Sequence, residues 1–219
     1  MQDSPNSRRR WLLKAIAVTP FAIATGALAQ TLTPGRAKAR LIPTPKQVEG
    51  PYFLPNSPLT GRFIPQGMSG QEIHISGTVL DVDGNVIPNA TVHVWVASPT
   101  GVYDNQDAAG RPRRIPLAQQ TLRGRIITSA QGAYAFECLR PGNYELGGGM
   151  VRPAHIHVRV DAAGYQTLIT QLYFVDDQFN TRDLPGDEFF QPELLVPLSP
   201  AAPQAGQIQS GNYTFVLER

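Results

Sequence analysis

Short runs of alternating apolar and polar residues, ended by glycine or proline turns, recur along this 219-residue chain from residue 72 onward. Alternation with a period of two is typical of β-strands that bury one face. In the first of these runs Ile73, Ile75 and Val79 mark the buried face, and Asp83-Gly84-Asn85 after it has the composition of a hairpin turn. Six or more such strands predict an all-β fold with an antiparallel β-sandwich core and irregular loops.

Composition supports this fold class and narrows the function. Gly 20 and Pro 20 make up 40 of the 219 residues, so long helices are not expected in the body of the chain. The net charge of +2 comes largely from basic residues before position 41, which leaves a mildly acidic body without the clustered basic surface of a nucleic-acid-binding domain. No stretch of the body is apolar and long enough to span a bilayer. The single Cys138 lies in an alternating run, where a buried core position is expected, and it has no partner for an internal disulfide.

The first 29 residues resemble an export signal. A basic cluster at residues 8–10 precedes an apolar stretch, and Ala27-Leu28-Ala29 predicts cleavage before Gln30. The run Ser7 to Leu12 resembles a twin-arginine signal, which implies export of the folded protein by the Tat machinery to the periplasm or the outside. An uncleaved N-terminal anchor helix is the alternative. After the signal we expect an extended arm or linker over 30–46 and one domain over 47–219.

Two of the four histidines, His155 and His157, stand one residue apart in a predicted strand. Residues i and i+2 of a strand point to the same face, so both imidazoles can reach one metal ion. A solvent-facing strand produces the same pattern, so this pair alone leaves the two interpretations evenly balanced. His74 and His93 occur singly in strands and are expected to be structural. Asp176 and Asp177 are candidates for a carboxylate ligand, although a solvated turn is the more economical interpretation.

Two tyrosines lie on connections near strand ends, where functional side chains concentrate. Tyr103 follows a strand and a turn, and Tyr144 follows the turn Pro141-Gly142. A phenol has an ordinary pKa of about 10, but a trivalent metal can remove its proton and take the phenolate as a hard anionic ligand. Two phenolates with two imidazoles would suit Fe(III). Each tyrosine taken alone is as readily explained by packing.

The segments "WVASPTGVYDNQ", "TSAQGAYAF", "RPGNYEL", "RPAHIHVRV" and "LITQLYFVDD", in this order, resemble the catalytic domain of the intradiol ring-cleavage dioxygenases, and within them the protocatechuate 3,4-dioxygenase branch. The similarity covers roughly Val48 to Phe190. It implies a β-sandwich around a mononuclear non-haem Fe(III). The stretch Gly147 to Val151 departs from the protocatechuate enzymes, which carry a longer segment there, and no counterpart of the helical domain of the catechol 1,2-dioxygenases is expected.

Matched motif to motif, the resemblance implies that Tyr103 and His155 are the equatorial metal ligands and that Tyr144 and His157 are the axial ones. Tyr144 would also act in catalysis, because it leaves the metal when the substrate binds and takes a proton. Arg152 would stabilise negative charge on the substrate, and Gln171 would lie beside it. A surface ion pair for Arg152 and an ordinary polar strand position for Gln171 are the structural alternatives.

The activity implied is Fe(III)-dependent cleavage of a catechol-type aromatic between its two hydroxylated carbons, with both atoms of O2 entering a cis,cis-muconate-type diacid. The resemblance leaves open an oligomer of one or two kinds of chain. Two other classes remain: a non-catalytic transthyretin-like or carboxypeptidase-regulatory-like binding module, which "ISGTVLDVDGNVIPNATVHVW" also resembles, and a copper or zinc enzyme that uses the H-x-H pair.

Overall fold

A computed structural model describes residues 39–180 and 190–219, which fold around two β-sheets. One sheet has the order β10-β1-β4 and the other β3-β2-β7-β8-β9, while β5 and β6 form a separate hairpin. The strands are β1 Glu72–Asp81, β2 Thr91–Val96, β3 Arg123–Ile127, β4 Ala133–Leu139, β5 Tyr144–Gly147, β6 Met150–Arg152, β7 His155–Asp161, β8 Leu168–Phe174, β9 Leu195–Val196 and β10 Gln209–Leu217. Two short 3-10 helices, Leu117–Gln119 and Pro192–Leu194, are the only helices in these ranges, and neither is long and apolar enough to cross a membrane.

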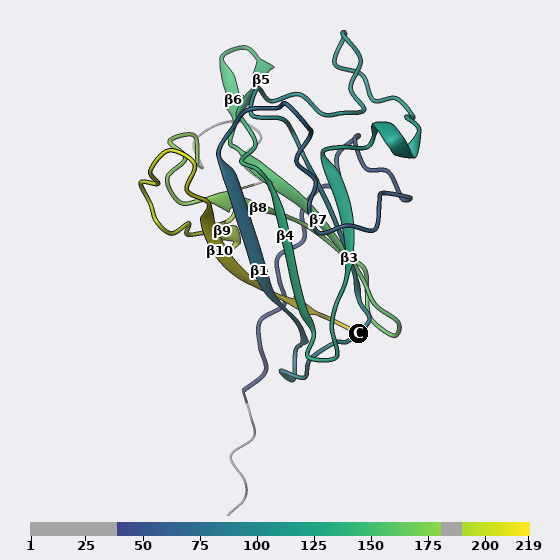
Figure 1. Ribbon diagram of the computed structural model, residues 1–219. Coiled ribbons are helices and arrows are strands. Elements are labelled where there is room, and N and C mark those ends of the chain that lie inside the picture. The colour runs from purple at the N-terminus through teal and green to yellow at the C-terminus, as the bar shows by residue number, and fades with distance from the viewer. Residues whose placement is uncertain (1–38, 181–189) are drawn as a thin grey trace, which may run out of the picture. The chain divides into compact units, whose positions relative to one another are not determined.

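The core lies between the two sheets, as the alternating pattern predicts. Ile73, Ile75 and Val79 of β1 are fully buried and pack in one cluster with apolar residues of β2, β7 and β8 from the facing sheet. Figure 1 shows β1 and β4 passing in front of β7 and β8, with the β5–β6 hairpin projecting at one end. Cys138 is fully buried in this core, and burial raises the pKa of its thiol. The prediction of a core cysteine is therefore confirmed.

The strand pairing corrects the expected antiparallel order in two places. β1 runs parallel to β10, and β8 runs parallel to β9, so both sheets are mixed. The turn predicted at Asp83-Gly84-Asn85 forms, with an antiparallel bridge between Leu80 and Val86 across it, but it does not pair β1 with β2, which lie in different sheets. The Asp81 carboxylate also holds this turn by accepting hydrogen bonds from the Asp83 and Asn85 amides at 2.9 and 2.8 Å. The predicted turn at residues 162–164 does join an antiparallel pair, β7 and β8.

The predicted signal, residues 1–29, and the arm up to residue 38 lie outside the described residues. The rest of the arm is bound to the domain. The Thr44 amide donates to Val216 of β10 at 3.1 Å, and the Pro45 carbonyl accepts a hydrogen bond of 2.8 Å from the Thr170 hydroxyl of β8. This segment therefore leads the chain across β8 toward residues 48–53, which cover the five-stranded sheet.

Candidate metal centre

The two histidines of the H-x-H pair lie on the face of the five-stranded sheet that points away from the core. Ile156 and Val158, their neighbours on β7, point into the core and are fully buried. His155 and His157 are nevertheless only 2% and 3% exposed. Chain segments outside the sheet therefore cover them, and the polar strand facing water that the pattern also allowed is excluded.

The four side chains expected to bind a metal lie together. The Nε2 atoms of His155 and His157 are 3.2 Å apart, and the Tyr103 hydroxyl is 3.3 Å from His155 Nε2. The Tyr144 ring centroid lies 5.7 Å from that of His155 and 6.4 Å from that of Tyr103. Two imidazoles from β7, one phenol from β5 and one phenol from the loop after β2 thus lie together in one cluster.

Their protonation leaves lone pairs available for a cation. Burial, and after it the nearby Arg152 charge, lower the pKa of His155 to about 3, although the hydrogen bond with the Pro153 carbonyl acts in the opposite direction. His155 Nδ1 lies 2.7 Å from that carbonyl, which can only accept, so Nδ1 carries the proton and Nε2 the lone pair. The pKa of His157 is lowered by burial, by His155 and by the Arg152 and Arg123 charges. Both imidazoles are therefore neutral.

The tyrosines complete a donor set for a hard metal ion. Burial raises the pKa of Tyr103 and Tyr144, although the Arg152 charge works against this shift at both phenols. Such phenols become phenolates only beside a strong positive charge. Within residues 39–180 and 190–219, no group of three or more His, Cys, Asp or Glu side chains could hold a metal. The donors present therefore fit a cation that accepts two phenolates and two imidazoles, such as Fe(III).

Arg152 and Gln171 are buried beside the histidines, which excludes the surface ion pair considered for Arg152. Arg152 is 9% exposed and donates a 2.6 Å hydrogen bond from Nη2 to Gln171 Oε1. Gln171 is fully buried on β8 and is directly paired with His157. Its Oε1 also accepts from the Tyr173 hydroxyl at 2.9 Å, and its Nε2 donates to the Val48 carbonyl at 2.9 Å. The guanidinium is thus bonded to Gln171, which Tyr173 and Val48 in turn hold in place.

The glycine run after Tyr144 forms the turn of the β5–β6 hairpin. Gly147, Gly148 and Gly149 have φ values of 92°, 63° and 81°, a region that favours glycine. The hairpin pairs Tyr144 directly with Arg152, so the loop that departs from the protocatechuate enzymes connects two residues of the site.

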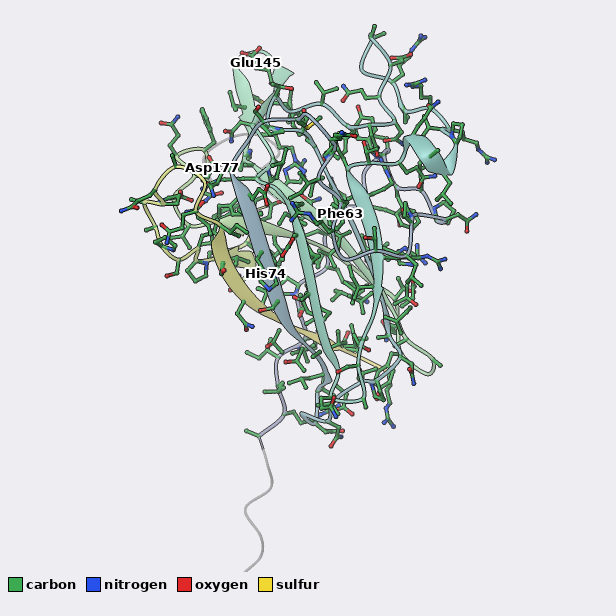
Figure 2. All side chains as sticks on the ribbon, in the orientation of Figure 1. Phe63, His74, Glu145 and Asp177 are labelled. Atoms are coloured by element: carbon green, nitrogen blue, oxygen red, sulfur yellow. The ribbon has the colours of Figure 1, made fainter. Side chains whose placement is uncertain are left out.

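The other candidate residues lie elsewhere or serve other contacts. Asp176 forms a bidentate ion pair with Arg140 at 2.7 and 2.8 Å. Asp177 accepts a 2.8 Å hydrogen bond from the Ala154 amide, next to His155, so it holds the start of β7. Among the described residues, neither joins the two histidines in a group that could hold a metal. His74 pairs with Glu137 across the three-stranded sheet, and Figure 2 shows it well below the hairpin that carries Glu145. His93 is buried 3.6 Å from Asp161.

Sequence reasoning missed the aromatic residues that enclose the ligands. Trp95 of β2 is directly paired with His157 and stacks on it, with ring centroids 4.8 Å apart and an angle of 6° between the planes. Tyr52 stacks on Tyr103 at 4.3 Å and 16°. A Cβ added at Gly50 would lie 3.3 Å from His157 Cε1. The alternation of β2 already placed Trp95 on the face opposite the core, but nothing local indicated that Gly50 and Tyr52 would cover that face.

Known proteins with this fold and site are ring-cleaving dioxygenases. The family model described as "Dioxygenase" matches residues 48–218. The chain is 31% identical over 194 residues to chlorocatechol 1,2-dioxygenase of Rhodococcus opacus, which covers 80% of this chain and 72% of that protein. It is 33% identical over 157 residues to catechol 1,2-dioxygenase of Candida albicans, and there spans only 50% of the relative's length. The chain belongs to the intradiol ring-cleavage dioxygenase family, whose members generally use non-haem Fe(III).

Solved structures agree with this assignment. The dioxygenase domain of a dioxygenase–carbohydrate-binding protein fusion from Streptomyces sp. SirexAA-E has a TM-score of 0.63 and 32% identity, with 81% of this chain and 99% of that chain covered. The 3-chlorocatechol 1,2-dioxygenase of Rhodococcus opacus 1CP has a TM-score of 0.68 and 26% identity, with 80% and 73% covered. These relatives are a domain and a 1,2-dioxygenase, so the protocatechuate branch of the family stays a prediction for this chain.

Proposed function

We propose that this protein is an Fe(III)-dependent dioxygenase that cleaves a catechol-type aromatic between its hydroxylated carbons, with Tyr103, Tyr144, His155 and His157 as the metal ligands. The observation that carries this proposal is the meeting of two neutral imidazole nitrogens and two phenolic oxygens on the outer face of the five-stranded sheet. Fe(III) bound there would be chelated by both oxygens of a catechol and would make the ring reactive toward O2.

Tyr144 is the tyrosine suited to leave and to accept a proton. Tyr103 is 3% exposed and packs with Trp95 and Ala97, whereas Tyr144 is only partly buried and belongs to the short β5–β6 hairpin. Burial holds the pKa of the free Tyr144 phenol above its ordinary value, so its Oη binds a proton firmly once it is away from the metal. A catechol must lose two protons to chelate a metal, and Tyr144 Oη would take one of them.

Arg152 supplies the fixed positive charge. Its guanidinium is buried and held by Gln171, so negative charge that develops on the substrate meets a cation that needs no reorganisation. The Arg152 charge also lowers the pKa of both ligand tyrosines and both histidines, which favours phenolate and neutral imidazole, the forms that bind metal.

The substrate class we propose is catechol, protocatechuate or a related dihydroxyaromatic. The relatives named above act on catechol and chlorocatechol, and another, from Nocardioides simplex, is a hydroxyquinol 1,2-dioxygenase. The predicted signal over 1–29 supports an enzyme that works in the periplasm or outside the cell. Replacement of Arg8 and Arg9 by lysine, followed by cell fractionation, should retain the protein inside the cell, and unchanged export would overturn the twin-arginine assignment.

Metal analysis and spectroscopy of the purified full chain test the proposal. We expect one iron per chain, a burgundy to red colour from tyrosinate-to-Fe(III) charge transfer, and O2 uptake with at least one of catechol, protocatechuate and hydroxyquinol. Copper or zinc would support the alternative H-x-H enzyme, and no metal the binding module. Tyr144→Phe should lose most activity and change colour, whereas Tyr165→Phe, in the β7–β8 turn, should alter neither. A Tyr144→Phe protein with full colour and activity would sink the assignment of Tyr144.

A further inference from the structure

A fully buried arginine lies behind the candidate metal centre and is not among the residues assigned to it. Arg123 of β3 is 0% exposed, and the side chain of its partner Asp104 is 5% exposed. Arg123 Nε lies 3.1 and 3.2 Å from the two carboxylate oxygens of Asp104, and Nη2 also donates to Asp104. A buried ion pair is costly to desolvate and contributes little net stability compared with apolar residues. Its presence beside the site calls for a role other than stability.

The remaining donors of Arg123 hold the two segments that surround Tyr103. Nη1 donates to the Tyr52 carbonyl at 2.7 Å, and Nη2 donates to Asn105 Oδ1 at 2.7 Å. Asn105 Nδ2 donates to the same Tyr52 carbonyl at 3.3 Å. One planar guanidinium thus joins Tyr52 to the residues that directly follow Tyr103 in the chain.

Tyr52 transmits this restraint to the ligand ring. Its ring stacks on that of Tyr103, with centroids 4.3 Å apart and 16° between planes. Its hydroxyl donates a 2.6 Å hydrogen bond to the Gly110 carbonyl. Tyr52 is therefore fixed at its main chain by Arg123 and at its far end by Gly110, and Tyr103 is held both by its ring face and by its own neighbours.

Sheet register places Arg123 in the same row as the histidine site. Arg123 is paired with Trp95, Trp95 with His157, and His157 with Gln171. Directly paired residues point to the same face of a sheet, so Arg123 and the Gln171–Arg152 pair flank His157 from opposite sides. Arg123 lies at the end of this row that holds Tyr52 and Tyr103, and Gln171 lies at the other end.

We propose that Arg123 is a positioning residue that sets the orientation of the Tyr103 ring at the metal, by fixing Tyr52 and the Asp104-Asn105 segment together. This inference rests on the proposed function for its effect on the reaction. Lysine at this position would keep the charge but lose the planar arrangement of donors that serves three acceptors at once. A role confined to charge would therefore survive Arg123→Lys, and a positioning role would not.

The experiment compares Arg123→Lys with Arg125→Lys in the full-length protein. Arg125 lies two residues along β3, on the same face, and donates to the Ser57 carbonyl at 3.0 Å, with no hydrogen bond to Tyr52 or Tyr103. Four quantities are measured: iron content, the tyrosinate charge-transfer band, kcat and KM for the best substrate, and the near-ultraviolet circular dichroism of the metal-free protein. Asn105→Ser, which leaves the ion pair intact, is the second variant and decides the outcome if Arg123→Lys does not fold.

We expect Arg123→Lys to bind iron, to shift the charge-transfer band and to lower kcat roughly 10- to 100-fold, with a much smaller change in KM, because small misplacements of catalytic groups have effects of this size. Asn105→Ser should act in the same direction, and Arg125→Lys should match the wild type. A folded Arg123→Lys or Asn105→Ser protein with an unshifted band and unchanged kcat would overturn the proposal. Wild-type protein without iron would overturn the proposed function instead, and the circular dichroism of the metal-free variants would still show whether Arg123 orders the aromatic residues.

Discussion

Gly50 offers a quantitative test of how tightly the covering segment fits the site. Gly50 has a φ of 71°, and a Cβ there would lie 3.3 Å from His157 Cε1 and 3.7 Å from Nε2. In Gly50→Ala the left-handed backbone costs about 1 kcal/mol. The methyl group adds about 1 to 2 kcal/mol of overpacking, because His157 is stacked on Trp95 and has little room to yield.

Gly67→Ala is the matched control. Gly67 has a φ of 78° and nothing within 4 Å of its added Cβ, so it carries the backbone cost alone. For a chain of this size we expect thermal midpoints lower by about 3 °C in Gly67→Ala and about 6 to 9 °C in Gly50→Ala, measured by circular dichroism on the metal-free proteins.

Activity separates the two variants more sharply. Displacement of the His157 imidazole should lower kcat about tenfold or more in Gly50→Ala, whereas Gly67→Ala should keep wild-type kcat. If Gly50→Ala had the same thermal midpoint as Gly67→Ala and kept the wild-type kcat, the close approach of residues 48–53 to the histidines would be refuted.

Three further outcomes are expected. In the metal-free protein the unfolded state takes up protons below about pH 6.5, whereas the folded His155, with a pKa of about 3, does not. The free energy of unfolding, measured with urea, should therefore be highest above pH 6.5 and fall by up to about 2 kcal/mol per buried ligand histidine between pH 6.5 and 5. A stability that does not change over this range would contradict the burial of the histidines. Asp177→Asn weakens the hydrogen bond from the Ala154 amide and should destabilise the protein by about 1 to 3 kcal/mol. Asp176→Asn, at an exposed ion pair, should cost only about 0 to 1 kcal/mol. Equal losses of unfolding free energy in the two variants, measured with urea, would argue against the role of Asp177 in holding the start of β7. Arg152→Gln should reduce kcat about 100-fold or more with a smaller change in KM, and a loss confined to KM would indicate substrate binding only.

The alternating pattern was sufficient to predict the longer strands but neither the short strands β5, β6 and β9 nor the strand pairing. Ile73, Ile75 and Val79 are buried as expected because a strand with one polar face can bury only the other. The pattern does not say which strands are neighbours. Residues 83–85 have hairpin composition, yet the Asp81 side chain closes that turn locally and the chain then crosses to the other sheet. The parallel partner of β1 is the last strand of the chain, more than a hundred residues away, and no local signal indicates such a pairing.

The candidate site likewise contains residues that the sequence indicated and residues that only the fold brings in. The H-x-H pair could be derived from strand periodicity, and the order of the motifs added Tyr103 and Tyr144. Arg123 could not be identified from the sequence, because its partners are more than 15 residues away along the chain. In addition, a charged residue in a strand normally indicates a face in contact with water. Local patterns report which face a residue occupies, whereas the coverage of that face depends on segments brought in by the fold.

The most direct test of the central claim is the fate of molecular oxygen. The purified iron-containing protein is incubated with catechol under oxygen-18 gas, and the product is analysed by mass spectrometry. Intradiol cleavage predicts a cis,cis-muconate-type diacid in which both oxygen-18 atoms are retained. A product opened beside the hydroxylated carbons rather than between them, or the absence of any ring-opened product across the panel of catechols, would contradict it.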